Sequence, residues 1–360
     1  MHRVANFYAG PSTLPLEVLE EIQKDLLDFN NTGMSIIEIS HRSKAFSKMI
    51  TETEQNFREI LNIPDDYAVL FMQGGASMQF PLIPMNLKKD GGTFTYINTG
   101  AWSKKAIKEA QIQGDTAVLA SSEDKNFSYI PDLTNLQIPE NAAYLHITSN
   151  NTIAGTQYQS FPDTGDVPLV ADMSSDFLSK PIDVSKFGII YAGAQKNVGP
   201  SGLGIVIIRK DLAEQVAESV PTFFRYKTHV DKDSLFNTPN SFAIYVVGLV
   251  VKRLKKLGGL EAIAEINEEK AKILYDVIDN SSLYQGVADK NSRSLMNVTF
   301  TLSNSDLEAK LLEESIAADL IGIKGHRSVG GFRASIYNAQ SIENVKKLAV
   351  FLQDFENKNK

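Results

Sequence analysis

One lysine stands in an apolar, glycine-punctuated segment near the middle of the chain. Residues 188–209 read GIIYAGAQKNVGPSGLGIVIIR and place Lys196 in the turn between two predicted core strands. Burial disfavours an ammonium, so it lowers the lysine pKa and makes available the neutral, nucleophilic amine that a Schiff-base lysine requires. A lysine whose stem packs on the core while its ammonium reaches water would show the same pattern. From this segment alone, both interpretations stay open.

A glycine-rich turn follows the strand predicted at residues 68–72. Its sequence, QGGAS at residues 73–77, allows a tight turn whose free N–H groups can face an anion such as a phosphate. The turn lacks the Gly-Lys-Ser/Thr of a Walker loop, the GxGxxG of a dinucleotide site and the final glycine of a nucleophile elbow, since Gln79 stands there. A plain strand-to-helix turn is the alternative to a phosphate site.

Three further side chains follow predicted strands or lie in the loops beyond them. Asp172 ends the strand at residues 169–171, Thr152 lies in the loop after residues 143–148, and Trp102 opens a helix. A carboxylate at such a strand end can hold a protonated pyridine nitrogen, although turn aspartates and core tryptophans are common. Together with the lysine and the glycine turn, these groups suit pyridoxal 5'-phosphate.

Motifs along nearly the whole chain resemble the class-V branch of the fold-type-I pyridoxal-phosphate enzymes. The combination is specific, although each motif alone is weak. The motifs are NFYAGPSTLP, SHRSKAF, GGASMQF, NTGAWSKKA, ADMSSDF, YAGAQKNVGPSG and KGHRSVGGFRASIYNA. The resemblance implies an α/β fold with a mostly parallel seven-stranded sheet in a large domain, a smaller C-terminal α/β domain, and one pyridoxal 5'-phosphate per subunit.

The resemblance also implies a role for each residue around the cofactor ring. Lys196 would bond covalently to the cofactor and shuttle the proton between the substrate Cα and the cofactor carbon. Trp102 would stack on the ring, Asp172 would stabilise the protonated pyridine nitrogen, and Thr152 would hydrogen-bond the phenolate oxygen. The cofactor supplies the electron sink that these residues tune.

The cofactor phosphate would be held by neutral groups from two subunits. Ala76 and Ser77 would offer backbone N–H groups, with Gln195 beside them. The resemblance assigns further contacts to Asn237 of the partner subunit and Thr238 of the partner subunit, which implies a homodimer. Some relatives carry a basic residue in the loop at residues 75–77, so the neutral loop of this chain leaves the strength of phosphate binding in question.

Two His-Arg pairs and one more arginine mark the expected substrate side. They are His41, Arg42, His326, Arg327 and Arg333. Guanidinium groups bind carboxylates and phosphates bidentately, although any single arginine could serve an ordinary surface ion pair. By resemblance, Arg333 would take the α-carboxylate, and the two pairs would take the phosphate of phosphoserine or the distal carboxylate of glutamate.

The reaction implied is a ping-pong transfer of the amino group between L-glutamate and 3-phosphooxypyruvate, giving O-phospho-L-serine and 2-oxoglutarate. Such an enzyme serves L-serine biosynthesis, and the sequence leaves a part in vitamin B6 biosynthesis open. Cysteine desulfuration is excluded because the chain has no cysteine. An alanine-glyoxylate or serine-pyruvate transaminase remains an alternative, as does a non-catalytic protein that binds a phosphorylated metabolite. Lys196 argues against the non-catalytic protein, because a binding protein has no use for a lysine in the core beside a carboxylate and a tryptophan.

Composition describes an ordinary globular chain that is long enough for two domains. Of its 360 residues, 43% are hydrophobic and 22% are charged, and its net charge is −7. The acidic balance argues against a nucleic-acid surface, and the lack of cysteine excludes thiolate metal sites and disulfides. We expect no metal, no membrane span and no signal peptide, and therefore a cytoplasmic protein.

The elements that must position these residues follow from apolar periodicity. A first helix, capped by Ser12 or Thr13, is expected to run to Phe29, and a second carries apolar residues 46–61. Alternating strands and helices then indicate an α/β sheet. Its strands are expected at residues 68–72, 93–98, 116–120, 143–148, 169–171 and around Ile189 and Ile205.

Beyond residue 242 the pattern changes to long helices and then restarts. Helices are expected at residues 242–257, 260–278, 305–320 and 341–355, and strands at 295–302 and 332–336. We predict a large domain of residues 15–255 and a small domain of residues 256–360 together with residues 1–14. The motifs alone do not settle where the first dozen residues lie.

Overall fold

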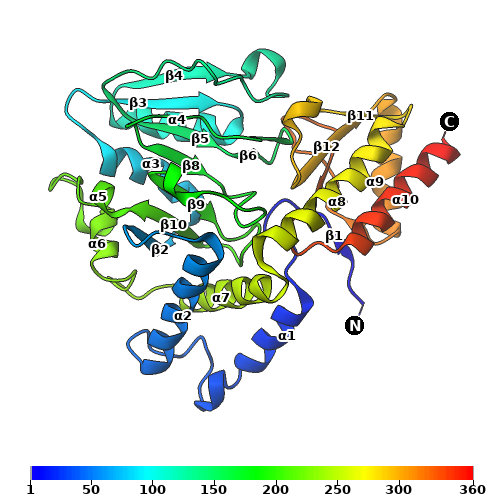
Figure 1. Cartoon of the computed structure of the whole chain (residues 1–360). Helices are drawn as coiled ribbons and strands as arrows, with labels where there is room; N and C mark the ends of the chain where they lie inside the picture. The colour runs from blue at the N-terminus through cyan, green and yellow to red at the C-terminus, as the bar shows by residue number, and fades with distance from the viewer. Residues whose placement is uncertain (1, 360) are drawn as a thin grey trace.

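Seven strands form one mixed sheet through the larger part of the molecule (Figure 1). The computed structural model describes residues 2–359 and orders the strands β2-β10-β9-β8-β5-β3-β4. Strand β10 runs antiparallel to both of its neighbours, and the other neighbouring pairs are parallel. The prediction of a mostly parallel, seven-stranded sheet is confirmed. The strands are β2 Tyr67–Gln73, β3 Thr93–Asn98, β4 Thr116–Ser121, β5 Ala142–Thr148, β8 Leu169–Asp172, β9 Ile189–Gly193 and β10 Leu203–Arg209.

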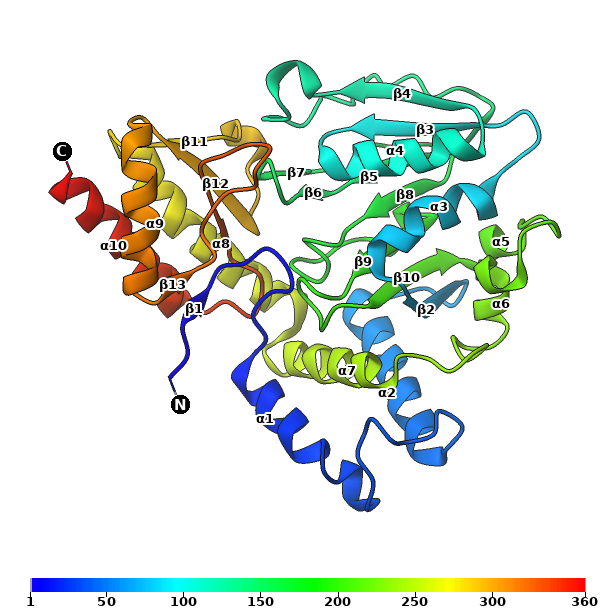
Figure 2. The same cartoon turned by 180° about the vertical axis from the view of Figure 1, so that it is seen from behind.

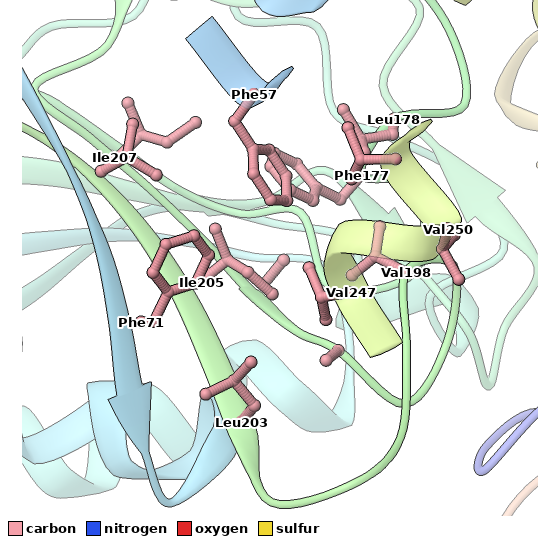
Figure 3. Close-up of a cluster of buried hydrophobic side chains, with 14 of the residues drawn as sticks. Phe57, Phe71, Phe177, Leu178, Val198, Leu203, Ile205, Ile207, Val247 and Val250 are labelled. Carbon is pink, nitrogen blue, oxygen red and sulfur yellow. The ribbon is translucent and has the colours of Figure 1, made fainter. Parts of the chain in front are cut away.

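Helices cover both faces of this sheet, which explains why its central strands are apolar throughout. In β10, Ile205 and Ile207 belong to one hydrophobic cluster, and Val206 and Ile208 belong to another on the opposite face. Figure 3 shows the first cluster, in which Phe57 packs over the sheet beside residues of a second helix. Alternate side chains of each central strand therefore enter different cores.

The long helices agree in order with those expected from periodicity, whereas the short helices α5 and α6 were not predicted. Ten α-helices are described within residues 2–359, and short 3₁₀ turns lie at residues 29–31, 123–125, 184–186, 222–224, 290–292 and 305–307. The helices are α1 Leu16–Asp25, α2 Lys44–Leu61, α3 Gly75–Leu87, α4 Ala101–Gln113, α5 Lys210–Ala213, α6 Tyr226–Val230, α7 Ser241–Lys256, α8 Gly259–Asp279, α9 Glu308–Ala317 and α10 Ile342–Lys358. None of the helices in this described range is long and apolar enough to cross a membrane.

The bounds of the first helix were predicted wrongly. Helix α1 starts at Leu16 with Pro15 as its N-cap, rather than after Ser12 or Thr13. Proline disfavours the helical region for the residue before it, so the turn cannot begin earlier. The helix ends at Asp25, and Phe29 lies in a separate 3₁₀ turn in which Asn30 has a positive φ of 52°.

A smaller α/β part lies beside one end of the large sheet. Strands β11 Tyr284–Gly286, β12 Asn297–Leu302 and β14 Phe332–Ser335 form an antiparallel sheet in the order β11-β12-β14. Its core takes residues from α8, α9 and α10 and also from the N-terminal segment, including Ala5 and Phe7. A two-residue pair, β6 Asn150–Asn151 with β7 Thr156–Gln157, closes the loop after β5.

The N-terminal segment folds back onto this smaller part, which answers a point that the sequence left open. Strand β1 Ala5–Asn6 pairs in parallel with β13 Leu320–Ile321, and Figure 2 shows the two strands side by side. This pairing also shortens α9, which was expected to reach Leu320. The chain instead turns at Asp319, with a φ of 61°, and enters β13.

Candidate active site

Lys196 lies in the turn between β9 and β10 and meets two of the predicted site residues. Its Nζ donates a hydrogen bond to Thr152 Oγ1 over 3.0 Å. The same Nζ lies 5.6 Å from the centroid of the Trp102 ring. The structure therefore brings together an amine and a hydroxyl from two loops and an aromatic face from the first turn of α4.

The surroundings of Lys196 favour a reactive amine. Burial lowers the pKa of Lys196 to about 8, while the charges of Asp172 and Asp176 act to raise it and that of Arg333 acts to lower it. A lysine with its ordinary pKa would be almost fully protonated at neutral pH. The shift leaves an appreciable neutral fraction, which is the form that attacks a carbonyl carbon.

Asp172 is the buried carboxylate at the end of β8. Its Oδ1 accepts hydrogen bonds from the Ser174 N–H over 2.9 Å and from the Ser174 hydroxyl over 2.6 Å. Burial raises the pKa of Asp172, while Lys196 and the Ser174 hydrogen bonds act to lower it. These partners favour the charged form, which a protonated ring nitrogen would need opposite it.

The glycine turn opens α3 in the geometry that an anion site requires. Gly74 and Gly75 both have positive φ values, 92° and 64°, and α3 starts at Gly75 with the N–H groups of its first turn free of helix partners. A Cβ at Gly204 would lie 3.1 Å from the Gly75 carbonyl oxygen, so β10 approaches this turn closely. Ala76 and Ser77 belong to this first turn, as predicted from the sequence.

Three other residues were expected around the phosphate, namely Gln195, Asn237 and Thr238. Gln195 Oε1 is buried and has no hydrogen-bond partner among the described residues. The Thr238 carbonyl accepts a hydrogen bond from Gln73 Nε2 over 2.9 Å, and Asn237 Nδ2 also reaches this carbonyl, over 3.3 Å. Residues 237–238 thus lie beside the last residue before the glycine turn.

Arg333 extends the site toward the smaller part of the molecule. Its Nη1 donates to the Thr152 carbonyl over 3.5 Å, and its Nε is buried without a partner in the described chain. Burial lowers the pKa of Arg333, and an anion would satisfy this unpaired donor. Trp102 Nε1 is a second buried donor without a partner in residues 2–359.

His326 and Arg327 lie in the loop between β13 and β14, within electrostatic range of Arg333. Burial lowers the pKa of His326, and the charges of Arg333, Arg327 and Lys105 lower it further. The His326 ring pairs through Nδ1 with Ser328 Oγ over 2.7 Å. The loop therefore joins a positively charged cluster that would attract a second anionic group.

His41 and Arg42 are not brought to this site by their own chain. Within residues 2–359, no hydrogen bond or ion pair joins either side chain to Lys196 or Arg333. Arg42 is exposed and lines a shallow groove along the start of α2 with Lys44 and Ser47. Figure 1 shows that α2 packs against α7, away from the smaller part that carries Arg333.

Sequence reasoning missed two residues that contact the site. Ser12 donates its backbone N–H to the Gln195 carbonyl over 2.9 Å and its hydroxyl to the Lys196 carbonyl. Lys105 Nζ lies 4.2 Å from the centroid of the Trp102 ring. The spacing of Trp102 and Lys105, three residues apart on a helix, could have indicated the second contact. In the described residues, no cluster of histidine, aspartate and glutamate is arranged to hold a metal ion.

Comparisons with known proteins agree on one family. The family model "Aminotransferase class-V" matches residues 4–348. The phosphoserine aminotransferase of Desulfatibacillum aliphaticivorans is 58% identical to this chain and 99% of each chain is covered, and that of Bacillus subtilis (strain 168) is 52% identical with full coverage of both. A solved phosphoserine aminotransferase from Bacillus circulans subsp. alkalophilus superposes with a TM-score of 0.98 at 50% identity over 99% of each chain.

Proposed function

We propose, since this chain belongs to the class-V aminotransferase family, that it transfers an amino group between L-glutamate and 3-phosphooxypyruvate, giving O-phospho-L-serine and 2-oxoglutarate. Full-length relatives at 52–58% identity that carry the name phosphoserine aminotransferase support this reaction, which is also the one predicted from the sequence. One observation carries the proposal. Arg333, with an unpaired buried donor, lies beside the Lys196–Thr152 pair at the edge of a positively charged cluster.

The side chains present fit pyridoxal 5'-phosphate as the cofactor. Trp102 offers a ring face, Asp172 a buried carboxylate, and the glycine turn free N–H groups at a helix N-terminus. When bound, the cofactor supplies the electron sink that stabilises negative charge at the amino-acid Cα. Gln195 and the backbone of Ala76 and Ser77 would hold its phosphate.

Lys196 and Asp172 divide the proton chemistry between them. With its lowered pKa, the Lys196 amine would take the proton from the substrate Cα and would deliver it to the cofactor carbon. Thr152 orients Nζ through their hydrogen bond and would also donate to the phenolate oxygen. Asp172 would keep the ring nitrogen protonated through its negative charge.

The arginines would select a substrate with two anionic groups. The Arg333 guanidinium would bind the α-carboxylate bidentately, because its Nε lacks a partner in the described structure. His326 and Arg327 would bind the phosphate of phosphoserine or the distal carboxylate of glutamate. His41 of the partner subunit and Arg42 of the partner subunit would complete this second anion site.

We also propose a homodimer with its active sites at the subunit interface. The distance of α2 from Arg333 within one chain supports a contribution of residues 41–42 to a second copy. Asn237 of the partner subunit and Thr238 of the partner subunit would reach the phosphate from across the same interface. In their own chain, residues 237–238 lie beside Gln73, the residue before the glycine turn.

The proposed division into domains is residues 15–255 and residues 256–360 with residues 1–14. Separate hydrophobic cores support it, because the two cores on the faces of the large sheet take nearly all of their residues from the first range and the third takes residues from both parts of the second range. A cytoplasmic role in L-serine biosynthesis follows from the proposed reaction. A part in vitamin B6 biosynthesis would require that phosphorylated threonine analogues also bind.

Spectroscopy of the two half-reactions tests the proposal. Purified protein reconstituted with pyridoxal 5'-phosphate should be yellow and should convert to the pyridoxamine form with L-glutamate, whereas the Lys196→Ala variant should lose that colour. Arg327→Ala should weaken the binding of phosphoserine and of glutamate by about 1.5–3 kcal/mol, as expected for the loss of a charge-assisted contact. The binding of alanine, which has no second anionic group, should be unchanged. A protein that cannot bind the cofactor would refute the proposal that this chain is an aminotransferase. Equal losses of binding for all three amino acids would favour the alternative of an alanine-glyoxylate transaminase.

A further inference from the structure

We propose that Ser174, Tyr191 and His146 are positioning residues that hold the Asp172 carboxylate through two hydrogen-bonded chains and so keep it charged opposite the cofactor ring. The proposal rests on the function above, because Asp172 has a partner to serve only if pyridoxal 5'-phosphate binds there. None of the three side chains would touch the cofactor or the substrate. Their effect would pass through Asp172.

The first chain runs from β9 through Ser174. The Ser174 hydroxyl accepts a hydrogen bond from the Gly193 N–H over 3.1 Å and lies 2.6 Å from Asp172 Oδ1. A hydroxyl has one proton, and an ionised carboxylate can only accept. Since the Gly193 N–H occupies a hydroxyl lone pair, the proton of Ser174 points to Asp172. The backbone of β9 therefore fixes the direction of this bond.

The second chain crosses three neighbouring strands of the sheet. Tyr191 of β9 stands opposite Asp172 of β8 in the strand register, and hydrogen bonding from Tyr191 lowers the pKa of that carboxyl. The Tyr191 hydroxyl also lies 2.9 Å from Nε2 of His146, which belongs to β5 on the other side of β8. The phenol thus stands between a carboxylate and an imidazole.

The proton positions in this second chain follow from burial. Burial lowers the pKa of His146 to about 3, so the ring is neutral and carries one N–H. Burial raises the pKa of Tyr191 well above its ordinary value, so the phenol keeps its single proton. Hydrogen bonds to an ionised acceptor are roughly twice as strong as those between neutral groups, so the phenol donates to Asp172.

His146 must then donate its Nε2–H to the Tyr191 oxygen. The structure agrees with this tautomer, because Nδ1 of His146 is buried and has no hydrogen-bond partner in the described chain. The other tautomer would bury an unpaired N–H at Nδ1 and would draw the phenol proton away from Asp172. Both the unpaired donor and the lost hydrogen bond to the carboxylate would destabilise the folded protein. Both chains therefore end with an O–H group that donates to the same buried carboxylate.

The same layer of the sheet supplies a matched control. Tyr144 is also fully buried, and its hydroxyl pairs with that of Tyr96 over 2.6 Å. No hydrogen bond of the described residues connects Tyr144 to Asp172. A Tyr144→Phe variant therefore removes one buried phenol oxygen from this layer, as Tyr191→Phe does, and leaves both chains intact.

The test uses the protein loaded with pyridoxal 5'-phosphate that carries ¹⁵N at the ring nitrogen. The nitrogen chemical shift reports directly whether this atom is protonated. We expect wild type and Tyr144→Phe to share the shift of a protonated nitrogen, while Tyr191→Phe and Ser174→Ala move toward the unprotonated value. Cofactor affinity should fall about 10- to 100-fold in the latter two, because each loses a hydrogen bond to a charged group.

His146 is tested by a pair of substitutions. His146→Gln keeps an N–H donor near the phenol and should restore the wild-type shift in large part, whereas His146→Leu should resemble Tyr191→Phe. If the leucine variant does not fold, the Tyr191 and Ser174 variants still decide the question. Circular dichroism of each variant establishes that it is folded.

Two outcomes separate this inference from the proposed function. Wild-type protein that fails to bind the cofactor through Lys196 would refute the function itself. Normal, Lys196-dependent binding with identical ¹⁵N shifts and affinities for Tyr191→Phe, Ser174→Ala and Tyr144→Phe would overturn the positioning role alone.

Discussion

The charge of a single amine governs how this protein reacts with an aldehyde. Burial brings the pKa of Lys196 from 10.5 to about 8, and Asp172 opposes this effect by stabilising the ammonium. Only the neutral amine attacks a carbonyl carbon. The reactivity of the cofactor-free protein should therefore rise with pH through a midpoint near the pKa of this one side chain.

We predict that the rate at which cofactor-free protein binds pyridoxal 5'-phosphate covalently rises with pH through a midpoint near 8, rather than near 10.5. In Asp172→Asn the midpoint should move lower, because the charge that favours the ammonium is gone. Stopped-flow absorbance over a series of pH values measures both midpoints. Lys180→Met, which removes another partly buried amine, should leave the midpoint unchanged. A midpoint near 10.5 would show that the site does not tune Lys196.

At the same scale, sequence reasoning identified the residues with a local signature. Lys196, Thr152 and Trp102 stood at turns or strand ends in recognisable motifs, and the structure brings them together. Ser12 was taken for a helix cap because its contact with the Lys196 carbonyl spans 184 positions of sequence. His146 carried no signal, since a histidine inside an apolar strand looks like any core residue until its neighbours are known.

Among the elements, the turn between β9 and β10 depends on how closely it can approach α7. A Cβ at Gly199 would lie 2.6 Å from Cγ2 of Val247, which is closer than carbon atoms pack. Val247 is buried in the core between α7 and the sheet, as Figure 3 shows, and has little room to move. Gly199 thus sets the position of the turn that carries Lys196.

We predict that Gly199→Ala lowers the free energy of unfolding by about 1–3 kcal/mol, the usual cost of overpacking a core. Displacement of the turn should also weaken cofactor binding. Urea unfolding and a fluorescence titration with pyridoxal 5'-phosphate measure the two effects. Ser201→Ala, at an exposed position of the same turn, is the control and should match wild type. Equal stability of both variants would mean that α7 yields to the added methyl group.

The order of helices and strands could be predicted because apolar residues recur at different spacings in amphipathic helices and in strands. The ends of these helices and strands were less predictable where they depend on contacts with residues far away in the sequence. Helix α9 stops before Leu320 because residues 320–321 pair with β1, more than 300 positions earlier in the chain. Pro15 offered a local signal for the start of α1, but the hydroxyl residues before it gave a competing one.

Across the whole molecule, one segment of the smaller part ties Arg333 to the loop that carries Lys196 and to the loop that follows Asp172. This segment, residues 336–340, follows β14 directly. Lys270 of α8 is buried beneath it and donates to the carbonyls of Ile336, Tyr337 and Gln340 over 2.9, 2.7 and 3.1 Å. The segment is therefore held rigidly on its own side.

Asn338 makes the connection to the other side. Its N–H donates to Asn197 Oδ1 over 2.9 Å, and its Nδ2 donates to the Leu178 carbonyl over 2.7 Å. Its Oδ1 accepts from Asn267 Nδ2 over 2.9 Å. Asn197 is the neighbour of Lys196, and Leu178 lies in the loop that follows Asp172. The sequence could not reveal this link, because Asn197 and Asn338 alone look like turn residues and Asn267 looks like an ordinary helix residue.

We predict that Asn338→Ala raises the KM for L-glutamate and lowers the free energy of unfolding by about 1–3 kcal/mol, because the buried Leu178 carbonyl loses its donor. Arg333 would no longer be held in line with Lys196, whereas the groups that bind the cofactor lie in the larger part and should keep their affinity for it. Steady-state kinetics, urea unfolding and a cofactor titration measure these effects. Asn280→Ala, which removes an exposed asparagine from the end of α8, is the matched control. A variant with weakened cofactor binding and an unchanged KM would contradict this view, because Asn338 would then support the Lys196 turn rather than the alignment of the two parts.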